Sequence, residues 1–303
     1  MRIKKASCLL AIFPHIFLAS SCIAMGKPAP YGSGEALGKI SDTRLTEISG
    51  MVASRHFPGV LWVHNDSGDD SLIYAVTAMG KVIGAVLVTG AKAQDWEDIA
   101  LGPGPVKGQD YLYLGDIGDN QGRRPFIAVY RIPEPDPGSL DSHTPSPSNR
   151  SVAHRLVYPD QPRDAETLLV DPLSGELLIV SKREFFSRVY RAPSPTSTTE
   201  TVTMELVCLL PWGFATGGDI SPDGRQIVIR SPGNAMLWQR KPNTPFKEVL
   251  PHLGKNVQLA QEPQGEAICF DHQGRNLYTV SEGKHPVLYR YSVTPASQHE
   301  TSP

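Results

Sequence analysis

The chain has 303 residues, of which 29 are Lys or Arg and 31 are Asp or Glu, so its formal net charge is −2. Without the first 21 residues, which carry three basic and no acidic side chains, the net charge falls to −5. This balance excludes a typical nucleic-acid-binding protein, which would show a basic excess on at least one segment. A chain of this length can bury a large core as a single domain.

The N-terminus predicts an exported protein. A basic start over residues 2–5 precedes an apolar stretch from Cys8 to Leu18, and small residues follow it. This is the layout of a secretory signal peptide, which we place at residues 1–24. The segment 18–22, Leu-Ala-Ser-Ser-Cys, also resembles the lipobox of bacterial lipoproteins, so lipidation of Cys22 and ordinary cleavage after residue 24 both stay open. The expected location is the periplasm, the outer membrane as a lipoprotein, or the medium.

Five segments further along share one pattern, in which an acidic residue begins a short apolar strand that often ends in a turn. They begin at Glu47, Glu97, Glu166, Asp219 and Glu266. Each is followed by two more strand-like runs rich in β-branched and aromatic residues, and four of the five third runs carry a tyrosine in the same place. Because no long stretch shows apolar residues at helical spacing, the pattern predicts an all-β chain.

Fourth strands are expected in the first four repeats, at residues 82–88, 152–158, 205–210 and 246–250. The fifth repeat lacks one, and the spare strand Ala36–Ile40 can supply it and close the ring. This predicts a β-propeller of five four-stranded blades. Six blades stay possible, although a Pro/Ser-rich insert at 133–149 explains the one long repeat, and a second such loop spans 193–200. We expect a linker at 25–35, the propeller at 36–292 and a disordered polar tail at 293–303.

In a propeller, the first strand of each blade lines the central channel. The connections between blades and the hairpins between second and third strands then share one rim, which we call the channel mouth. Turns that contain Asp171, Ser221 and Asp271 fall on the opposite rim, where Asp and Gly serve as turn formers.

Acidic residues collect at the channel mouth, where their mutual repulsion would cost several kcal/mol unless something offsets it. An oxygen-rich site without thiolates suits Ca²⁺, or else Mg²⁺, better than zinc. We therefore predict metal ligands among Asp66, Asp95, Glu97, Asp116, Asp119 and Glu266. The alternative is that acids at blade entries accept backbone N–H bonds from the next blade.

Asp98 and Glu166 are the candidate catalytic residues, since they could hold metal or activate water. Basic residues share the same rim, and Lys182, Arg183 and Arg230 are the candidates for binding an anionic substrate next to a cation. The alternative is that these basic side chains only pair with neighbouring carboxylates. The sequence contains no G-x-S-x-G motif, so nothing supports a serine nucleophile.

A resemblance adds to these expectations. It rests on Glu-Ile-Ser-Gly-Met at 47–51, Asn-Asp-Ser-Gly at 65–68, Leu-Ile-Tyr-Ala-Val at 72–76, Asp-Trp-Glu-Asp-Ile-Ala at 95–100, Tyr-Leu-Tyr-Leu-Gly-Asp-Ile-Gly-Asp-Asn at 111–120 and Asp-Ala-Glu-Thr-Leu at 164–168. With these motifs the chain resembles uncharacterised exported bacterial β-propeller proteins over most of residues 45–290. More distantly it is similar in architecture to the phytase-like and calcium-dependent lactonase propellers.

Three functions follow as hypotheses. The first is a divalent-cation-dependent hydrolase that acts on a phosphate ester, an ester or a lactone at the channel mouth. The second is a non-catalytic envelope propeller that binds a protein or glycan and uses Ca²⁺ only to stiffen its rim. A glycosidase is a third, because carboxylate pairs suit that chemistry. In each case we expect a monomer that contacts a membrane only through a lipid anchor.

Overall fold

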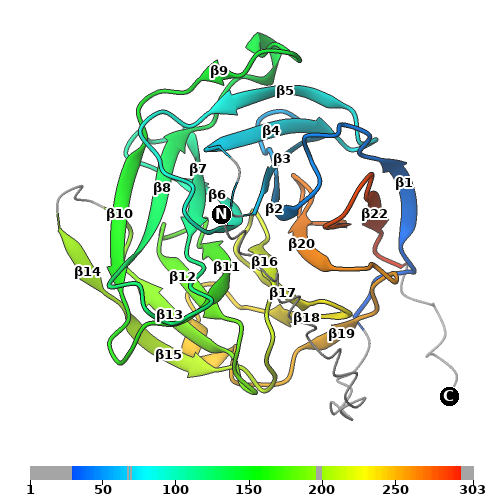
Figure 1. Ribbon diagram of the computed structural model, residues 1–303. Coiled ribbons are helices and arrows are strands. Elements are labelled where there is room, and N and C mark those ends of the chain that lie inside the picture. Colours follow the sequence, from blue (N-terminus) through cyan, green and yellow to red (C-terminus); the bar gives the residue numbers. More distant parts are fainter. Residues whose placement is uncertain (1–28, 67, 69, 196–199, 295–303) are drawn as a thin grey trace, which may run out of the picture.

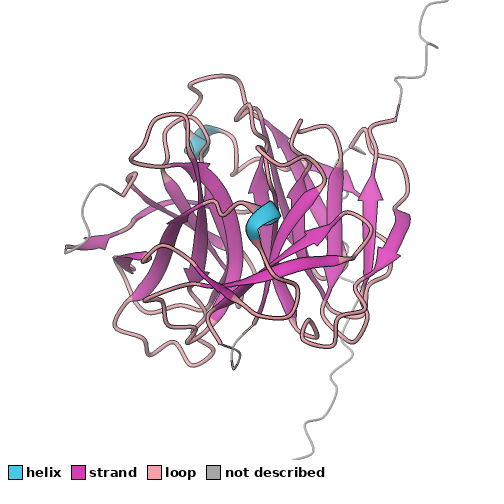
Figure 2. Cartoon of the chain, turned by 90° about the horizontal axis from the view of Figure 1, so that it is seen from above, coloured by secondary structure: helices cyan, strands magenta, loops and turns pink. Residues whose placement is uncertain are grey.

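A computed structural model describes residues 29–66, 68, 70–195 and 200–294 of the chain. The predicted signal peptide with Cys22 and most of the predicted C-terminal tail lie outside these residues. Five antiparallel sheets are arranged around a central axis, as Figure 1 shows, so the chain is a five-bladed β-propeller. The view in Figure 2 shows that strands dominate the chain. The described residues form two short 3-10 helices and no α-helix, and none of their helices could cross a membrane.

Each of the first three blades is built from four antiparallel strands that follow in chain order outward from the axis. Blade I contains β2 (Ile48–Ala53), β3 (Val60–Asn65), β4 (Leu72–Thr77) and β5 (Val82–Leu87). Blade II contains β6 (Trp96–Pro103), β7 (Asp110–Asp116), β8 (Ile127–Pro133) and β10 (Val152–Val157). Blade III contains β11 (Ala165–Val170), β12 (Leu177–Ser181), β13 (Arg188–Ala192) and β15 (Glu205–Leu209).

The last two blades complete the ring. Blade IV contains β16 (Gly217–Ile220), β17 (Gln226–Ser231), β18 (Asn234–Gln239) and β19 (Lys255–Val257). Blade V contains β20 (Gly265–Phe270), β21 (Leu277–Ser281), β22 (Val287–Tyr291) and β1 (Glu35–Lys39). The N-terminal strand β1 pairs with β22, as predicted, so the first and last segments of the chain share one sheet and close the ring.

Two extra strands, one within the first predicted loop and one directly after the second, are added to the outside of blades. The insert at 133–149 contains the 3-10 helix η1 (Pro137–Ser139) and the short strand β9 (Ser146–Pro147), which pairs in parallel with β5. After the second loop, β14 (Thr201–Thr203) pairs in parallel with β10. Both additions lie at a sheet edge, where proline is tolerated because the missing N–H faces outward.

One strand prediction is wrong. Residues 246–250 form the 3-10 helix η2 (Phe246–Glu248) and the turn after it, and β19 is the outer strand of blade IV instead. Phe246, Val249 and Leu250 are all buried in one cluster with side chains of blades III and IV. Their spacing of three and four residues is helical, and a five-residue apolar run is too short to reveal that period by itself.

The core consists of five apolar clusters, one between each pair of adjacent blades. The predicted linker is attached to the last of these interfaces where it is described. Ala29 is buried between blades IV and V and donates its N–H to the carbonyl of Asn256 at 2.7 Å. Tyr31 forms a β-bridge with Val293, which fixes the start of the predicted tail.

Candidate functional site

A β-bulge recurs at the channel-mouth end of the inner strands. In four blades the register of the first strand skips one residue, and these residues are Ser49, Glu97, Glu166 and Glu266. Blade IV has Thr216 in the equivalent position, directly before β16, where its N–H bonds to the carbonyl of Arg230. A bulge re-aims a side chain out of the normal alternation of a strand. Three glutamates and two hydroxyls thus occupy one repeated position around the channel.

These side chains meet across blade boundaries. Ser49 Oγ lies 3.4 Å from Glu97 Oε2 of the next blade, and Thr216 Oγ1 donates to the carbonyl of Gly265 at 3.1 Å. The ammonium of Lys182, in the hairpin after β12, binds the carboxylate of Glu166 and lies 3.9 Å from Glu266. The repeated position is therefore a ring around the axis, and Lys182 lies between two of its acids.

Two groups of carboxylates at the mouth could each hold a metal ion. One group is Asp66, Asp95 and Glu97, and the other is Glu97, Asp164 and Glu166. In each group one ligand atom per residue lies within 4.8 Å of the others, and Glu97 belongs to both. All donors are carboxylate oxygens, which suits Ca²⁺ or Mg²⁺.

The protein balances the charges of these acids only in part, because Lys182 binds Glu166 and Arg183 binds Asp164 while the acids still repel one another. Burial raises the pKa of Glu97 well above its usual value, and the carboxylates of Glu166, Asp66 and Asp95 raise it further. Burial and the charges of Asp66 and Asp164 raise the pKa of Asp95 to about 6. Burial and Glu266 also raise the pKa of Glu166, although Lys182 opposes this shift. Such clustered like charges favour either a proton or a cation between the oxygens.

The same imbalance extends around the ring to blade V. Glu266 is 8% exposed, and its Oε2 atom is buried without a hydrogen-bond partner among the described residues. Burial first, then Glu266 and Asp66, raise the pKa of Glu282 to about 7. Burial lowers the pKa of Lys182, but its carboxylate neighbours outweigh burial and raise it.

Asp98, a candidate catalytic residue, lies below the ring and is 1% exposed. Its carboxylate accepts the N–H of Ile99 at 2.9 Å and that of Leu168 in blade III at 3.0 Å. Asp219 makes the same pair of bonds between blades IV and V, to Ile220 and Phe270. Both acids therefore tie one blade to the next, as the alternative reading of the sequence expected.

The predicted ligands Asp116 and Asp119 lie in and after the end of β7 and are engaged by Arg124. Asp116 accepts the Arg124 guanidinium at 2.8 Å and the N–H of Asp95 at 3.0 Å. Asp119 accepts the Arg124 N–H at 2.7 Å, and its own N–H bonds to Asp164 at 2.8 Å. These two acids support Asp95 and Asp164 and are absent from both carboxylate groups.

The predicted anion-binding residues separate in the structure. Lys182 is in the ring, whereas the half-exposed Arg183 binds the carboxylate of Asp164 and the side chain of Asn120. Arg230 is fully buried, pairs with Glu262 at 2.8 Å and donates to the carbonyl of Ala267 at 2.9 Å. Its guanidinium is thus part of the interface between blades IV and V.

Asp164, Glu282, Ser49 and Thr216 are functional-site residues that were not predicted as such from the sequence. A signal for Asp164 was present, because Asp-x-Glu occurs at both 95–97 and 164–166, the entries of adjacent blades. Ser49 and Thr216 carry no charge, so only alignment on the bulge position identifies them as members of the ring.

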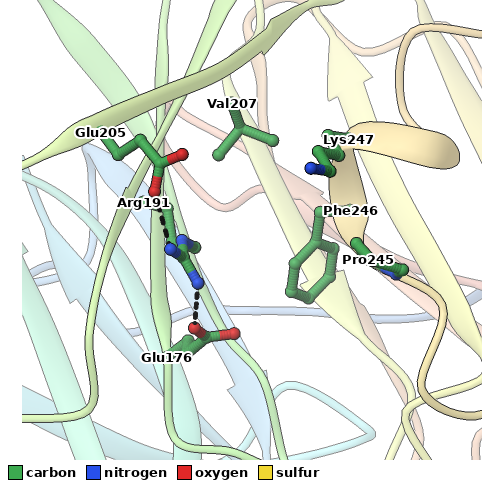
Figure 3. Close-up of a pocket in the computed structure, with 7 residues that line it drawn as sticks. All are labelled: Glu176, Arg191, Glu205, Val207, Pro245, Phe246 and Lys247. Carbon is green, nitrogen blue, oxygen red and sulfur yellow. Dashed lines mark hydrogen bonds and ion pairs between the residues drawn. The ribbon is translucent and has the colours of Figure 1, made fainter.

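A cavity of about 290 Å³ lies away from this ring, between β15 and η2, and Figure 3 shows it. Arg191 spans its wall and binds Glu176 at 2.5 Å and Glu205 at 2.6 Å. The charges in this wall therefore compensate one another, and the cavity contains none of the predicted site residues.

No protein-family model matches the sequence, and no curated protein matches it. Solved structures similar to this chain include the PQQ-bound aldose sugar dehydrogenase of Streptomyces coelicolor, at 12% identity over 88% of this chain and 99% of that chain, with a TM-score of 0.49. Hydrazine synthase of Kuenenia stuttgartiensis matches at 12% identity over 83% and 97% of the two chains, with a TM-score of 0.43. The Dos1 propeller matches at 11% identity over 82% and 68%, with a TM-score of 0.38. At these values the likenesses carry no argument about activity, and the propeller assignment rests on the strand topology.

Proposed function

We propose that this chain is a divalent-cation-dependent hydrolase of phosphate-ester, ester or lactone substrates, with the cation at the channel mouth. The observation that carries the proposal is the position of Glu97. Its buried carboxylate is shared by two groups of acids whose oxygens converge within 4.8 Å. Ca²⁺ is the cation we expect, and Mg²⁺ is the alternative.

The donor set supports Ca²⁺ on chemical grounds. Ca²⁺ takes six to eight oxygen ligands in flexible geometry, whereas Mg²⁺ demands near-ideal octahedral geometry. All the donors that the two groups offer are carboxylate oxygens, and they come from the side chains of Asp66, Asp95, Glu97, Asp164 and Glu166. A bound cation would offset the repulsion that raises the pKa values of Asp95 and Glu97.

The surrounding side chains could take part in ester hydrolysis. A divalent cation can polarise a carbonyl or phosphoryl oxygen as a Lewis acid. Glu282, whose pKa is raised to about 7, could carry a proton to or from a reacting group near neutral pH. Lys182 offers positive charge beside Glu166, where it could hold an anionic substrate.

A second function has a specific observation in its favour. Asp98 and Arg230, which a catalytic reading would use, are occupied in blade-to-blade contacts. This favours a non-catalytic envelope propeller in which the same cation stiffens the mouth and a protein or glycan binds elsewhere. Export, and attachment through Cys22, belong to both proposals, and loss of fatty-acid labelling in Cys22→Ala tests the anchor.

The experiment separates binding from turnover. Purified protein is assayed on phosphate esters, lactones and aryl glycosides with Ca²⁺ or with EDTA, alongside Glu97→Gln, Glu166→Gln and the control Glu205→Gln, whose side chain is 66% exposed on β15. A hydrolase shows EDTA-sensitive turnover that Glu97→Gln and Glu166→Gln lose and the control keeps. Cation binding without turnover supports the scaffold, and absence of both Ca²⁺ and Mg²⁺ binding by calorimetry defeats both proposals.

A further inference from the structure

A separate cavity of about 370 Å³ lies at the junction of blades V and I, beside the channel mouth. One wall is the segment that connects β1 to β2, and the other is the hairpin between β21 and β22. The residues that line it are Asp42, Thr43, Thr46, Lys284 and His285. None of them belongs to the carboxylate groups at the mouth.

The two walls are fixed to each other at both ends. The N–H of Ile40 bonds to the carbonyl of Pro286 at 3.0 Å, and the N–H of Gly283 bonds to that of Thr46 at 2.8 Å. Between these bonds His285 adopts a φ of 55°, the left-handed conformation that costs a non-glycine residue about 1 kcal/mol or more. Backbone strain of this kind is concentrated at ligand sites. The cavity is therefore preformed, as ligand pockets usually are.

The one acid in the cavity is neutralised by a fixed partner. Asp42 binds Arg44 through two bonds, at 2.9 Å from Nε and 2.6 Å from Nη2. Arg44 also donates to the carbonyl of Ser142 at 3.1 Å and lies over the ring of Tyr74, so it stays in place. A bidentate pair of this type leaves little negative charge for a ligand to meet.

The other residues that line the cavity carry hydrogen-bond donors. The ammonium of Lys284, the imidazole of His285 and the hydroxyls of Thr43 and Thr46 have no hydrogen-bond or ion-pair partner among the described residues. These residues line one cavity from both walls, and Thr43, Lys284 and His285 are also exposed to solvent. One cation, one imidazole and two hydroxyls form a set that suits an oxyanion.

We propose that this cavity binds the anionic group of a small molecule, a phosphate or a carboxylate, through Lys284, His285 and the two threonines. The site is distinct from the proposed cation site and does not depend on it, because none of its residues is a candidate metal ligand. Its position next to Glu47 and Glu282 places a bound anion at the edge of the channel mouth.

The test titrates inorganic phosphate and, in a separate arm, acetate by calorimetry into full-length protein that has been freed of divalent cations and then of chelator by dialysis. We expect binding in at least one arm, and the arm that binds more tightly identifies the ligand chemistry. Lys284→Gln should weaken that binding at least tenfold. Lys247→Gln, a lysine at the other cavity, should leave it unchanged.

A second variant separates loss of binding from loss of folding. His285→Gly removes the imidazole and relieves the positive φ, so it should weaken binding while raising the melting temperature. The proposal is overturned if neither anion binds up to about 10 mM, a range that covers weak millimolar sites. It is equally overturned if Lys284→Gln and His285→Gly bind with the affinity of the unaltered protein.

Discussion

The buried ion pair between Arg230 and Glu262 gives a sharp test of how the mouth is built. The side chain of Arg230 is 0% exposed and that of Glu262 is 1% exposed. Arg230→Met leaves the Glu262 carboxylate buried, and among the described residues only the Thr279 hydroxyl, at 3.0 Å, still donates to it. Breaking a buried pair in this way costs about 3–5 kcal/mol. That is a large share of the roughly 5–15 kcal/mol that stabilises a typical domain.

Urea unfolding of the unaltered protein and of Arg230→Met measures this cost as a shift of the midpoint at unchanged slope. Arg225→Met is the matched control, because its side chain is 63% exposed and that of its partner Asp223 is 59% exposed, so its loss should cost less than about 1 kcal/mol. The double variant Arg230→Met/Glu262→Leu should recover much of the lost stability, since no unpaired charge stays buried. A loss below about 1 kcal/mol for Arg230→Met would refute the structural role and return Arg230 to the anion-binding candidates.

Three further predictions concern Glu97 in the ring, the buried carboxyl group of Asp219, and the contact of β1 with blade I. Glu97→Gln should lower Ca²⁺ affinity at least tenfold, about 1.4 kcal/mol, in calorimetry, and unchanged affinity contradicts the cation site. In EDTA the same variant should raise the melting temperature, because it removes a buried carboxylate that its neighbours repel. Burial raises the pKa of Asp219 from 3.8 to about 6, so the folded protein loses stability as pH rises between these values and the carboxyl group ionises. Relative to Asp219→Asn, the unaltered protein should lose up to about 3 kcal/mol of unfolding free energy from pH 4 to pH 6.5 in urea titrations, and a difference that does not change with pH contradicts this prediction. Gly38→Ala in β1 would place a Cβ 2.2 Å from the carbonyl oxygen of Met79, in the turn between β4 and β5 of blade I, so it should destabilise the protein by about 1–3 kcal/mol in the same assay. A neutral effect would show that this contact between blades V and I relaxes without cost.

Much of the fold could be predicted from the sequence because propeller strands are local and repeated. Alternating apolar residues, third-strand tyrosines and glycine turns lie within about fifty residues of one another. Each blade can therefore be recognised from its own segment of sequence. Ring closure by the N-terminal strand followed from counting, since the last repeat lacked a fourth strand. Phe246–Leu250 was misread because a short apolar run has no period of its own.

The site was only half determined by the sequence. The repeat predicted acids at every blade entry, but it could not distinguish neighbouring acids such as Glu97 and Asp98. In the structure a β-bulge directs Glu97 into the ring, whereas Asp98 accepts a backbone N–H of the next blade. That bulge depends on pairing with β7, and the burial of Arg230 depends on the approach of blade V. Residue type and spacing therefore determined that this protein is an acidic-mouthed propeller. Only the tertiary structure decided which charges face one another across the channel, because that choice is made by contacts between segments far apart in the chain.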